Sequence, residues 1–172
     1  MTTLIPNPAA RVKERSARTV PCSVIETPLG FALVATRAIA AGESILEIEG
    51  RPQQEPTRYS IQIAHGTHIE ADGALPHEEM CARHPWRFLN HACEPNAHIA
   101  GRSLVARAAI AAGSQITFDY TTTEADMAEP FACQCGAASC LGSVRGFAHL
   151  SADERRAREP WLAPHLRDAL PR

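Results

Sequence analysis

The pattern of hydrophobic and polar positions predicts a chain built mostly from short strands. Apolar segments of five or six residues alternate with turns that contain Gly or Pro. The dipeptides His65-Gly66 and Gly101-Arg102 fit hairpin turns. Because helical periodicity is weak before the C-terminus, the pattern indicates a β-rich domain with several small sheets. The expected strands are Phe31–Thr36, Ile45–Glu49, Tyr59–Ala64, Thr67–Ala71, Ser103–Arg107 and Gln115–Asp119.

Two segments of the chain are similar to each other. Arg37–Ile45 and Arg107–Ile116 share the run Ala-Ile-Ala-Ala-Gly, and the second segment has one extra residue. Each has the form of a strand, a glycine-containing turn and another strand. Because two copies are too few to stack into a solenoid, we interpret them as two similar hairpin connections within one domain.

The C-terminal part of the chain has helical signals. Ser151 and Glu154 form a capping box, so we expect a helix from this point to about Arg158. The helix should end there because Pro160 follows closely. A second short helix is expected over Trp161–Leu170. Together they make a helical tail whose chemistry the sequence does not reveal.

Composition and charge narrow the possible function classes. The 172 residues suit one domain, and 45% hydrophobic with 21% charged residues is an ordinary globular balance. The formal net charge of −2 gives no basic excess, so we expect no direct nucleic-acid binding. No apolar run suits a membrane span, and the polar arm of residues 1–20 lacks the apolar core of a signal peptide. We therefore expect a cytoplasmic protein, with its oligomeric state open.

Six cysteines need an explanation in such a chain. Three of them lie within eight residues, in Cys133-Gln-Cys135-Gly-Ala-Ala-Ser-Cys140. One loop can therefore supply three of the four ligands of a tetrahedral zinc ion, and Cys93 is the obvious candidate for the fourth. Two alternatives stay open. The thiols can be reduced and free of metal, or they can form a redox pair, although such pairs usually have two intervening residues.

Four motifs, taken in order along the chain, resemble those of SET-domain protein lysine methyltransferases. Arg87–Asn96 resembles the RFxNHxCxPN signature, and Gly113–Tyr120 resembles the GEELTFDY segment. Cys133–Gly142 resembles the post-SET zinc motif, and Leu29–Thr36 resembles the N-terminal glycine segment. The resemblance covers about residues 22–147, and the short length is similar to that of compact bacterial members.

The resemblance implies a mostly β fold, the SET-domain fold. Small β-sheets surround a pseudoknot in which Arg87–Asn96 and Ile116–Tyr120 meet, and short C-terminal helices are added. The implied organisation is a flexible N-terminal arm (1–20), a SET domain (21–126), a post-SET zinc-binding segment (127–150) and a C-terminal helical tail (151–172).

The resemblance also implies a reaction and its cofactors. S-adenosyl-L-methionine would give its methyl group to the side-chain amine of a lysine in a protein or peptide substrate, and Zn²⁺ would stabilise the fold. The implied zinc ligands are Cys93, Cys133, Cys135 and Cys140. The residues implied to bind S-adenosylmethionine are Gly30, Phe31, Tyr59, Arg87, Asn90, His91, Val144 and Arg145.

The chemistry of methyl transfer fits this assignment. A lysine amine has a pKa of about 10.4 in water, and a dry channel beside a sulfonium charge favours its neutral form. Tyr120 is the implied catalytic residue, with its hydroxyl near the methyl group and the amine. Since a tyrosine with an ordinary pKa of about 10 is a poor base at neutral pH, we expect Tyr120 to orient both groups.

Three positions affect the expected substrate channel. Ile48 stands where the family often has a tyrosine, so one channel wall is expected to be apolar. Ala32 replaces the second glycine of the N-terminal motif, where a methyl group crowds the approach of the cofactor. Phe118 lines the channel with Tyr120 and favours di- or trimethylation. Ile48 and Ala32 keep an alternative open: a non-catalytic, zinc-stabilised SET-like module that binds a peptide or partner. A methyltransferase for another amine is a third possibility.

Overall fold

The computed structural model describes residues 20–168. Its strands are short and its helices have four to seven residues. The strands are β1 (Cys22–Thr27), β2 (Gly30–Ala35), β3 (Ser44–Glu47), β4 (Arg51–Gln53), β5 (Ile61–Ala64), β6 (Thr67–Glu70), β7 (Asn90–His91), β8 (Ala97–Ala100), β9 (Ser103–Ala106), β10 (Thr117–Phe118), β11 (Phe131–Ala132) and β12 (Ser143–Val144). The helices are α1 (His77–Arg83), α2 (Ala152–Arg158) and α3 (Pro164–Arg167), and single 3-10 turns lie at Pro85–Phe88, Tyr120–Thr122, Phe147–His149 and Glu159–Trp161.

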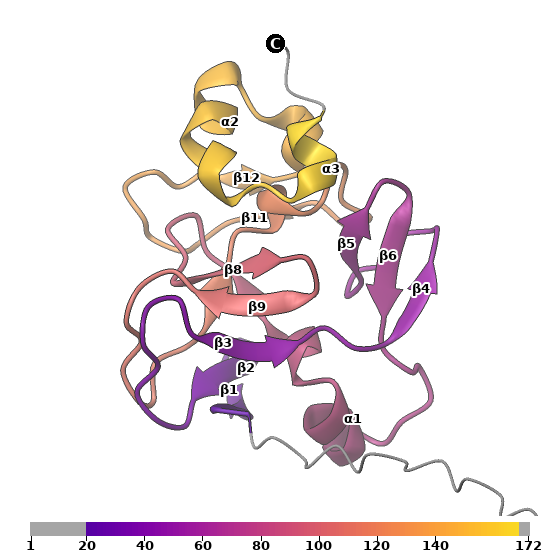
Figure 1. The fold of residues 1–172 in the computed structure, drawn as a ribbon, viewed down its shortest axis with the longest axis vertical. Coiled ribbons are helices and arrows are strands. Elements are labelled where there is room, and N and C mark those ends of the chain that lie inside the picture. The colour runs from indigo at the N-terminus through magenta and orange to yellow at the C-terminus, as the bar shows by residue number, and fades with distance from the viewer. Residues whose placement is uncertain (1–19, 169–172) are drawn as a thin grey trace, which may run out of the picture.

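The strands form several small sheets, as the sequence predicts. Antiparallel sheets are built by β1-β2, by β3-β9-β8, by β4-β6-β5 and by β11-β12, whereas β7 and β10 pair in parallel. Figure 1 shows the β3-β9-β8 sheet in the middle of the molecule, between α1 at one end and the pair α2 and α3 at the other. The mostly β fold class is confirmed.

Most of the predicted strands are confirmed with small shifts at their ends. The strand predicted over Tyr59–Ala64 begins at Ile61, because a turn precedes it: the Thr57 N–H donates to the Ser60 hydroxyl over 2.8 Å. The strand predicted over Gln115–Asp119 is wrong in extent. The continuous strand is only Thr117–Phe118, and Gln115 makes an isolated antiparallel bridge with Val34. The strand ends at Phe118 because the Asp119 side chain accepts the Thr121 N–H and begins a 3-10 turn.

Several elements were not predicted, namely β1, β4, β7, β8, β11, β12 and α1. Helix α1 was missed because Met80 is its only buried residue, so its sequence has no apolar periodicity. Both predicted hairpin turns are confirmed. Gly66 (φ +60°) joins β5 to β6, and Gly101 (φ +65°) joins β8 to β9, each in the left-handed region that glycine adopts without strain.

The two similar segments predicted as hairpin connections lie side by side and bond to each other. Ile39 and Ile110 exchange two backbone hydrogen bonds of 2.9 Å each. The glycine of each segment also donates to a residue just before the other segment. The Gly42 N–H donates to the Ala106 carbonyl, and the Gly113 N–H donates to the Ala35 carbonyl, both over 2.8 Å. The repeated sequence therefore forms a local pair in the core.

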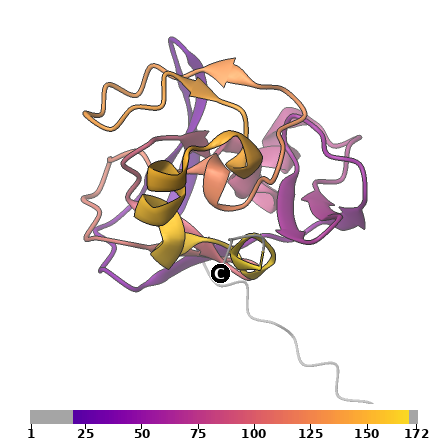
Figure 2. The same ribbon diagram turned by 90° about the horizontal axis from the view of Figure 1, so that it is seen from above.

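The C-terminal tail packs on its own small core. Leu150, Leu162 and Leu166 are buried together with Phe147, apart from the main core around Trp86. The predicted capping box of α2 is confirmed, and the helix ends at Arg158 as expected. The second predicted helix begins only at Pro164, since residues 159–161 form a 3-10 turn. Figure 2 shows α2 and α3 together over this end of the molecule.

Several predictions concern residues at the ends of the chain. The predicted N-terminal arm lies, except for its last residue, outside the described residues, as do residues 169 and 170 of the predicted second helix. Within residues 20–168, every helix is too short to cross a membrane.

Candidate active site and metal centre

A pocket opens where the two motif segments of the sequence meet. The parallel pairing of β7 with β10 places Asn90 opposite Thr117 and His91 opposite Phe118. The 3-10 turns on either side of this pair, together with the loop before β5, form the pocket walls. The residues that matter for its chemistry are Tyr59, Arg87, Leu89, Phe118, Tyr120 and Glu124.

Tyr120 is held in this pocket at both its backbone and its hydroxyl. The hydroxyl donates a 2.6 Å hydrogen bond to the Leu89 carbonyl, and the backbone N–H donates to Nδ1 of His91 over 3.2 Å. Burial raises the pKa of Tyr120 well above its usual value, and the nearby Glu124 carboxylate adds to this shift. The phenol therefore stays neutral and acts as a fixed hydrogen-bond donor.

Arg87 and Tyr59 form the second wall of the pocket. The Arg87 guanidinium lies over the Tyr59 ring, 4.1 Å from its centroid, and bonds to Glu70 over 2.6 Å. Glu70 also accepts the Thr57 hydroxyl and the Ala71 N–H. The arginine is thus fixed by a charge-assisted bond, while 45% of the Tyr59 side chain stays exposed.

Asn90 of β7 contacts Phe31 of β2. The Asn90 amide donates to the Phe31 carbonyl over 3.0 Å. The Phe31 ring packs against His77 of α1 with ring centroids 4.4 Å apart, and against Phe88. His77 was not predicted as a site residue, because α1 itself has no recognisable helical pattern.

Four cysteines form a candidate metal centre. Cys93 follows β7, and the other three lie in the loop of residues 133–142 between β11 and β12, named here the cysteine loop. Their sulfur atoms all lie within 4.8 Å of one another. The Cys93 and Cys133 sulfurs are 3.8 Å apart, close to the separation of about 3.8 Å that a tetrahedral zinc site with bonds of about 2.3 Å requires.

The four thiols have different surroundings. Burial raises the pKa of Cys93 and of Cys133, whereas backbone N–H groups point at several of the sulfurs. The Leu141 N–H points at the Cys93 sulfur over 3.3 Å, and the Gly142 N–H points at the Cys140 sulfur over 3.5 Å. Backbone N–H groups lower the pKa of Cys135 to about 6. Since the thiolate is the form that binds metal, the donor set fits a soft divalent ion such as Zn²⁺.

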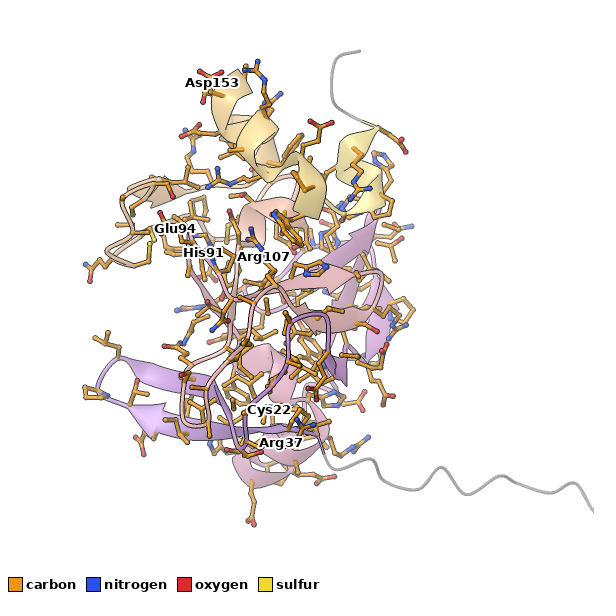
Figure 3. The ribbon with its side chains drawn as sticks, turned by 60° about the vertical axis from the view of Figure 1, so that its left-hand side comes forward. Cys22, Arg37, His91, Glu94, Arg107 and Asp153 are labelled. Atoms are coloured by element: carbon orange, nitrogen blue, oxygen red, sulfur yellow. The ribbon has the colours of Figure 1, made fainter. Side chains whose placement is uncertain are left out.

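His91 lies between the cysteines and Tyr120. Because its Nδ1 accepts the Tyr120 N–H, its hydrogen belongs on Nε2, which faces the Cys93 sulfur at 3.2 Å. Burial lowers the pKa of His91, so the ring is neutral. Figure 3 shows His91 and Glu94 on the side of the cysteine loop, whereas Cys22 lies at the opposite end.

The C-terminal tail supports the same wall of the pocket. Arg158 of α2 donates to the Asp119 carboxylate over 2.7 Å and to the Thr121 hydroxyl over 3.1 Å. The Ala163 N–H donates to the Thr122 carbonyl, and His165 Nε2 donates to the Thr123 carbonyl, both over 2.8 Å. These contacts join segments that are far apart in the sequence, and none of them was predicted.

The other predicted site residues are spread more widely. Ile48 is fully buried in the main core and is not part of the pocket wall, and Ala32 is also buried. Gly30 begins β2 with a φ of +115°. Val144 is fully buried in β12, whereas Arg145 is exposed and its carbonyl accepts the Met127 N–H.

Comparison with known sequences identifies one family. The SET domain profile matches residues 30–121. The chain is 30% identical over 123 residues to "Methyltransferase flvH" of Aspergillus flavus, covering 69% of this chain and 62% of that protein. It is 33% identical over 142 residues to "Histone-lysine N-methyltransferase, H3 lysine-36 specific" of Yarrowia lipolytica, covering 68% and 17%. The chain thus spans less than two thirds of the length of either relative.

Solved structures agree on the fold. The chain is similar to KRYPTONITE in complex with mCHG DNA and SAH, with a TM-score of 0.54, 22% identity, and coverage of 73% of this chain and 29% of that one. It is also similar to the methyltransferase domain of human SETMAR, with a TM-score of 0.53, 19% identity, and coverage of 72% and 57%. The matched profile covers more than half of this chain, and the chain belongs to the SET-domain family.

Proposed function

We propose that the protein transfers a methyl group from S-adenosylmethionine to the side-chain amine of a lysine in a protein substrate. One observation carries the proposal: the Tyr120 hydroxyl and the Leu89 carbonyl meet on the wall of a pocket that also holds Arg87 and Tyr59. Relatives named as methyltransferases and histone-lysine methyltransferases support it.

The pocket residues suit the needs of this reaction. Bound S-adenosylmethionine would supply an electrophilic methyl group. The Tyr120 hydroxyl and the Leu89 carbonyl present two oxygen atoms on one wall, and such atoms attract a polarised methyl group through weak C–H···O contacts. Phe118 is buried beside Tyr120 and keeps that part of the pocket apolar. The chain thereby orients the reactants beside an apolar part of the pocket wall.

The residues proposed to hold the cofactor lie on two sides of the β7-β10 pair. Arg87 offers a fixed positive charge, with Tyr59 as a flat neighbour. Asn90 fixes the Phe31 backbone next to Gly30, and His91 fixes the backbone of Tyr120. Val144 and Arg145 continue the proposed cofactor site after the cysteine loop, through their backbone and the exposed arginine.

We further propose that the four cysteines hold Zn²⁺. The ion would tie the cysteine loop to the end of β7, and its role is structural because all four ligands come from protein. The post-SET assignment of residues 127–150, a substrate that carries lysine, a cytoplasmic location and the lack of direct nucleic-acid binding stay predictions. Phe118 favours higher methylation states, so Phe118→Tyr should shift products toward monomethyl-lysine.

The first experiment is calorimetric titration of zinc-loaded protein with S-adenosylmethionine. Micromolar binding is expected, with about tenfold weaker binding for Asn90→Ala because the Phe31 carbonyl loses its donor. Tyr120→Phe should bind the cofactor as the wild type does. If the wild-type protein does not bind S-adenosylmethionine, the proposed cofactor site is contradicted.

The second experiment is a mass-spectrometric transfer assay with lysine peptides and small amines. Wild-type protein should methylate at least one lysine peptide, and Tyr120→Phe should be about 100-fold slower. Methylation of small amines alone would favour the third possibility, a methyltransferase for another amine. One relative is named as a methyltransferase without a stated substrate. Binding of cofactor and peptide without transfer favours the non-catalytic module.

A further inference from the structure

Glu124 is a buried carboxyl group in the same pocket, and the mechanism above gives it no role. It follows the Tyr120–Thr122 turn, and its N–H donates to the Tyr120 carbonyl over 2.9 Å. Only 9% of its side chain is exposed, yet it is part of the pocket wall with Tyr120 and Phe118. Burying a carboxylate costs free energy unless each oxygen has a hydrogen-bond partner.

One oxygen of Glu124 is satisfied and the other is not. Oε1 accepts the Gln62 N–H over 2.8 Å and the Thr123 hydroxyl over 3.3 Å. Oε2 has no hydrogen bond to any of residues 20–168, and its nearest polar neighbour is Nε2 of His68 at 3.7 Å, beyond hydrogen-bond distance. Glu124 is a residue of the pocket wall, and its Oε2 is therefore left free to accept a donor.

His68 does not act as that donor. Its Nδ1 lies 3.1 Å from the Gln54 carbonyl, which can only accept, so the ring hydrogen belongs on Nδ1. Burial lowers the pKa of His68 and keeps the ring neutral, which leaves Nε2 as a lone pair. Two acceptors thus face each other across 3.7 Å.

The cations near this pocket are engaged with other carboxylates. Arg87 pairs with Glu70 at 2.6 Å, and Arg58 lies 3.5 Å from Glu129 at the exposed rim. The remaining titratable neighbours are Tyr120, which stays neutral, and His165, whose Nε2 bonds to the Thr123 carbonyl. Burial raises the pKa of Glu124 to about 7, so its proton is exchangeable at physiological pH.

We propose that Glu124 receives the ammonium group of the substrate and takes one of its protons before methyl transfer. This inference rests on the proposed function and adds a proton acceptor to it. The ammonium N–H bond breaks and its proton moves to Oε2, leaving a neutral amine. The nitrogen lone pair then bonds to the methyl carbon, and the electrons of the C–S bond stay on sulfur. The product is a methylammonium and a neutral thioether, and Glu124 releases its proton to water.

The wild-type pH profile gives the first test. With Glu124 as acceptor, kcat/KM for a methylated lysine peptide should fall about tenfold per pH unit below about pH 7, where the carboxylate is protonated. It should stay level between about pH 8 and about pH 10, because the protonated amine is itself the reactive form. A tenfold rise per unit across that range overturns the proposal, since the amine then loses its proton in solution.

Glu124→Gln gives the second test. At about pH 7.5 the variant should be about 100-fold slower, and its rate should climb about tenfold per unit toward pH 10 as more amine arrives neutral. The matched control is Glu129→Gln, which changes a 59% exposed carboxylate at the rim of the same pocket and should keep the level profile. Cofactor affinity by calorimetry should be the same in all three proteins.

The outcomes separate the two proposals. Wild-type protein that methylates no amine contradicts the proposed function, and the role of Glu124 falls with it. Active wild type with an equal loss at every pH for Glu124→Gln, or with no loss, overturns the role of Glu124 alone. If circular dichroism shows that Glu124→Gln does not fold, the wild-type profile decides the question.

Discussion

The two sides of His91 are built in different ways. The pocket wall of residues 119–124 is buried apart from the half-buried Tyr120, and it is held by β5, by α2 and by the residues around α3. The cysteine loop joins two strands that pair over only two residues each, and Phe131 and Ala132 are exposed. One side is stabilised by burial and hydrogen bonds of the chain, whereas the other holds the four cysteines of the proposed zinc site. The proposed zinc therefore supports the edge of the site, and the chain supports its centre.

Removing the metal should cause the largest change in the difference in stability between the cysteine loop and the pocket wall. A chelator should release the cysteine loop, because structural zinc contributes about 10 kcal/mol or more to small zinc-dependent units. Hydrogen exchange should speed up across residues 131–144 and stay slow at residues 119–124. Equal loss of protection in both regions would mean that the pocket wall also depends on the ion.

Breaking the ion pair between Arg158 and Asp119 should destabilise the pocket wall and leave the cysteine loop unchanged. Their side chains are 10% and 3% exposed, so Arg158→Met leaves a buried, unpaired carboxylate. We expect a loss of about 3–5 kcal/mol in the free energy of unfolding, measured by urea titration, with unchanged zinc content. Arg156→Met is the matched control on the same helix: its pair with Asp153 is exposed and should be worth less than about 1 kcal/mol.

Glu124 should weaken the pocket wall as the pH rises. Its folded pKa of about 7 lies above the ordinary value of 4.5 for a glutamate, so the folded state keeps a proton that the unfolded state releases in this window. The free energy of unfolding should therefore fall between about pH 4.5 and about pH 7, by about 3 kcal/mol in total. Glu124→Gln should remove this slope and be the more stable protein at pH 8, as denaturation at several pH values would reveal. A steeper slope in the variant would contradict the assignment.

Loss of the α2 cap should have the smallest effect. The Ser151 hydroxyl accepts the Glu154 N–H, and Ser151→Ala should cost about 1 kcal/mol of stability. Since α2 carries Arg158, the loss belongs to the pocket side of the molecule. Zinc content and exchange in the cysteine loop should be unchanged, and a change in either would link the two regions.

Much of the site was visible in the order of motifs along the chain. The three clustered cysteines with Cys93 and the Asn90-His91 motif were named from the sequence, and the structure brings each group together. Ile48 was expected in the substrate channel, but it is fully buried in the core, because the strand that precedes it packs against β9. A residue's side of a sheet depends on its pairing partner, which the local pattern does not contain.

Features that depend on neighbours in the chain could be predicted from the amino-acid sequence: the glycine turns at Gly66 and Gly101, the capping box of α2, and a cluster of ligands within one loop. Contacts between distant segments could not be predicted in this way. Arg158 bonds to Asp119, which lies 39 residues earlier in the chain. Glu124 lies beside His68 of β6, and its Oε2 is left free. Burial and pairing set the charge state of such groups, and both arise only when the segments pack together.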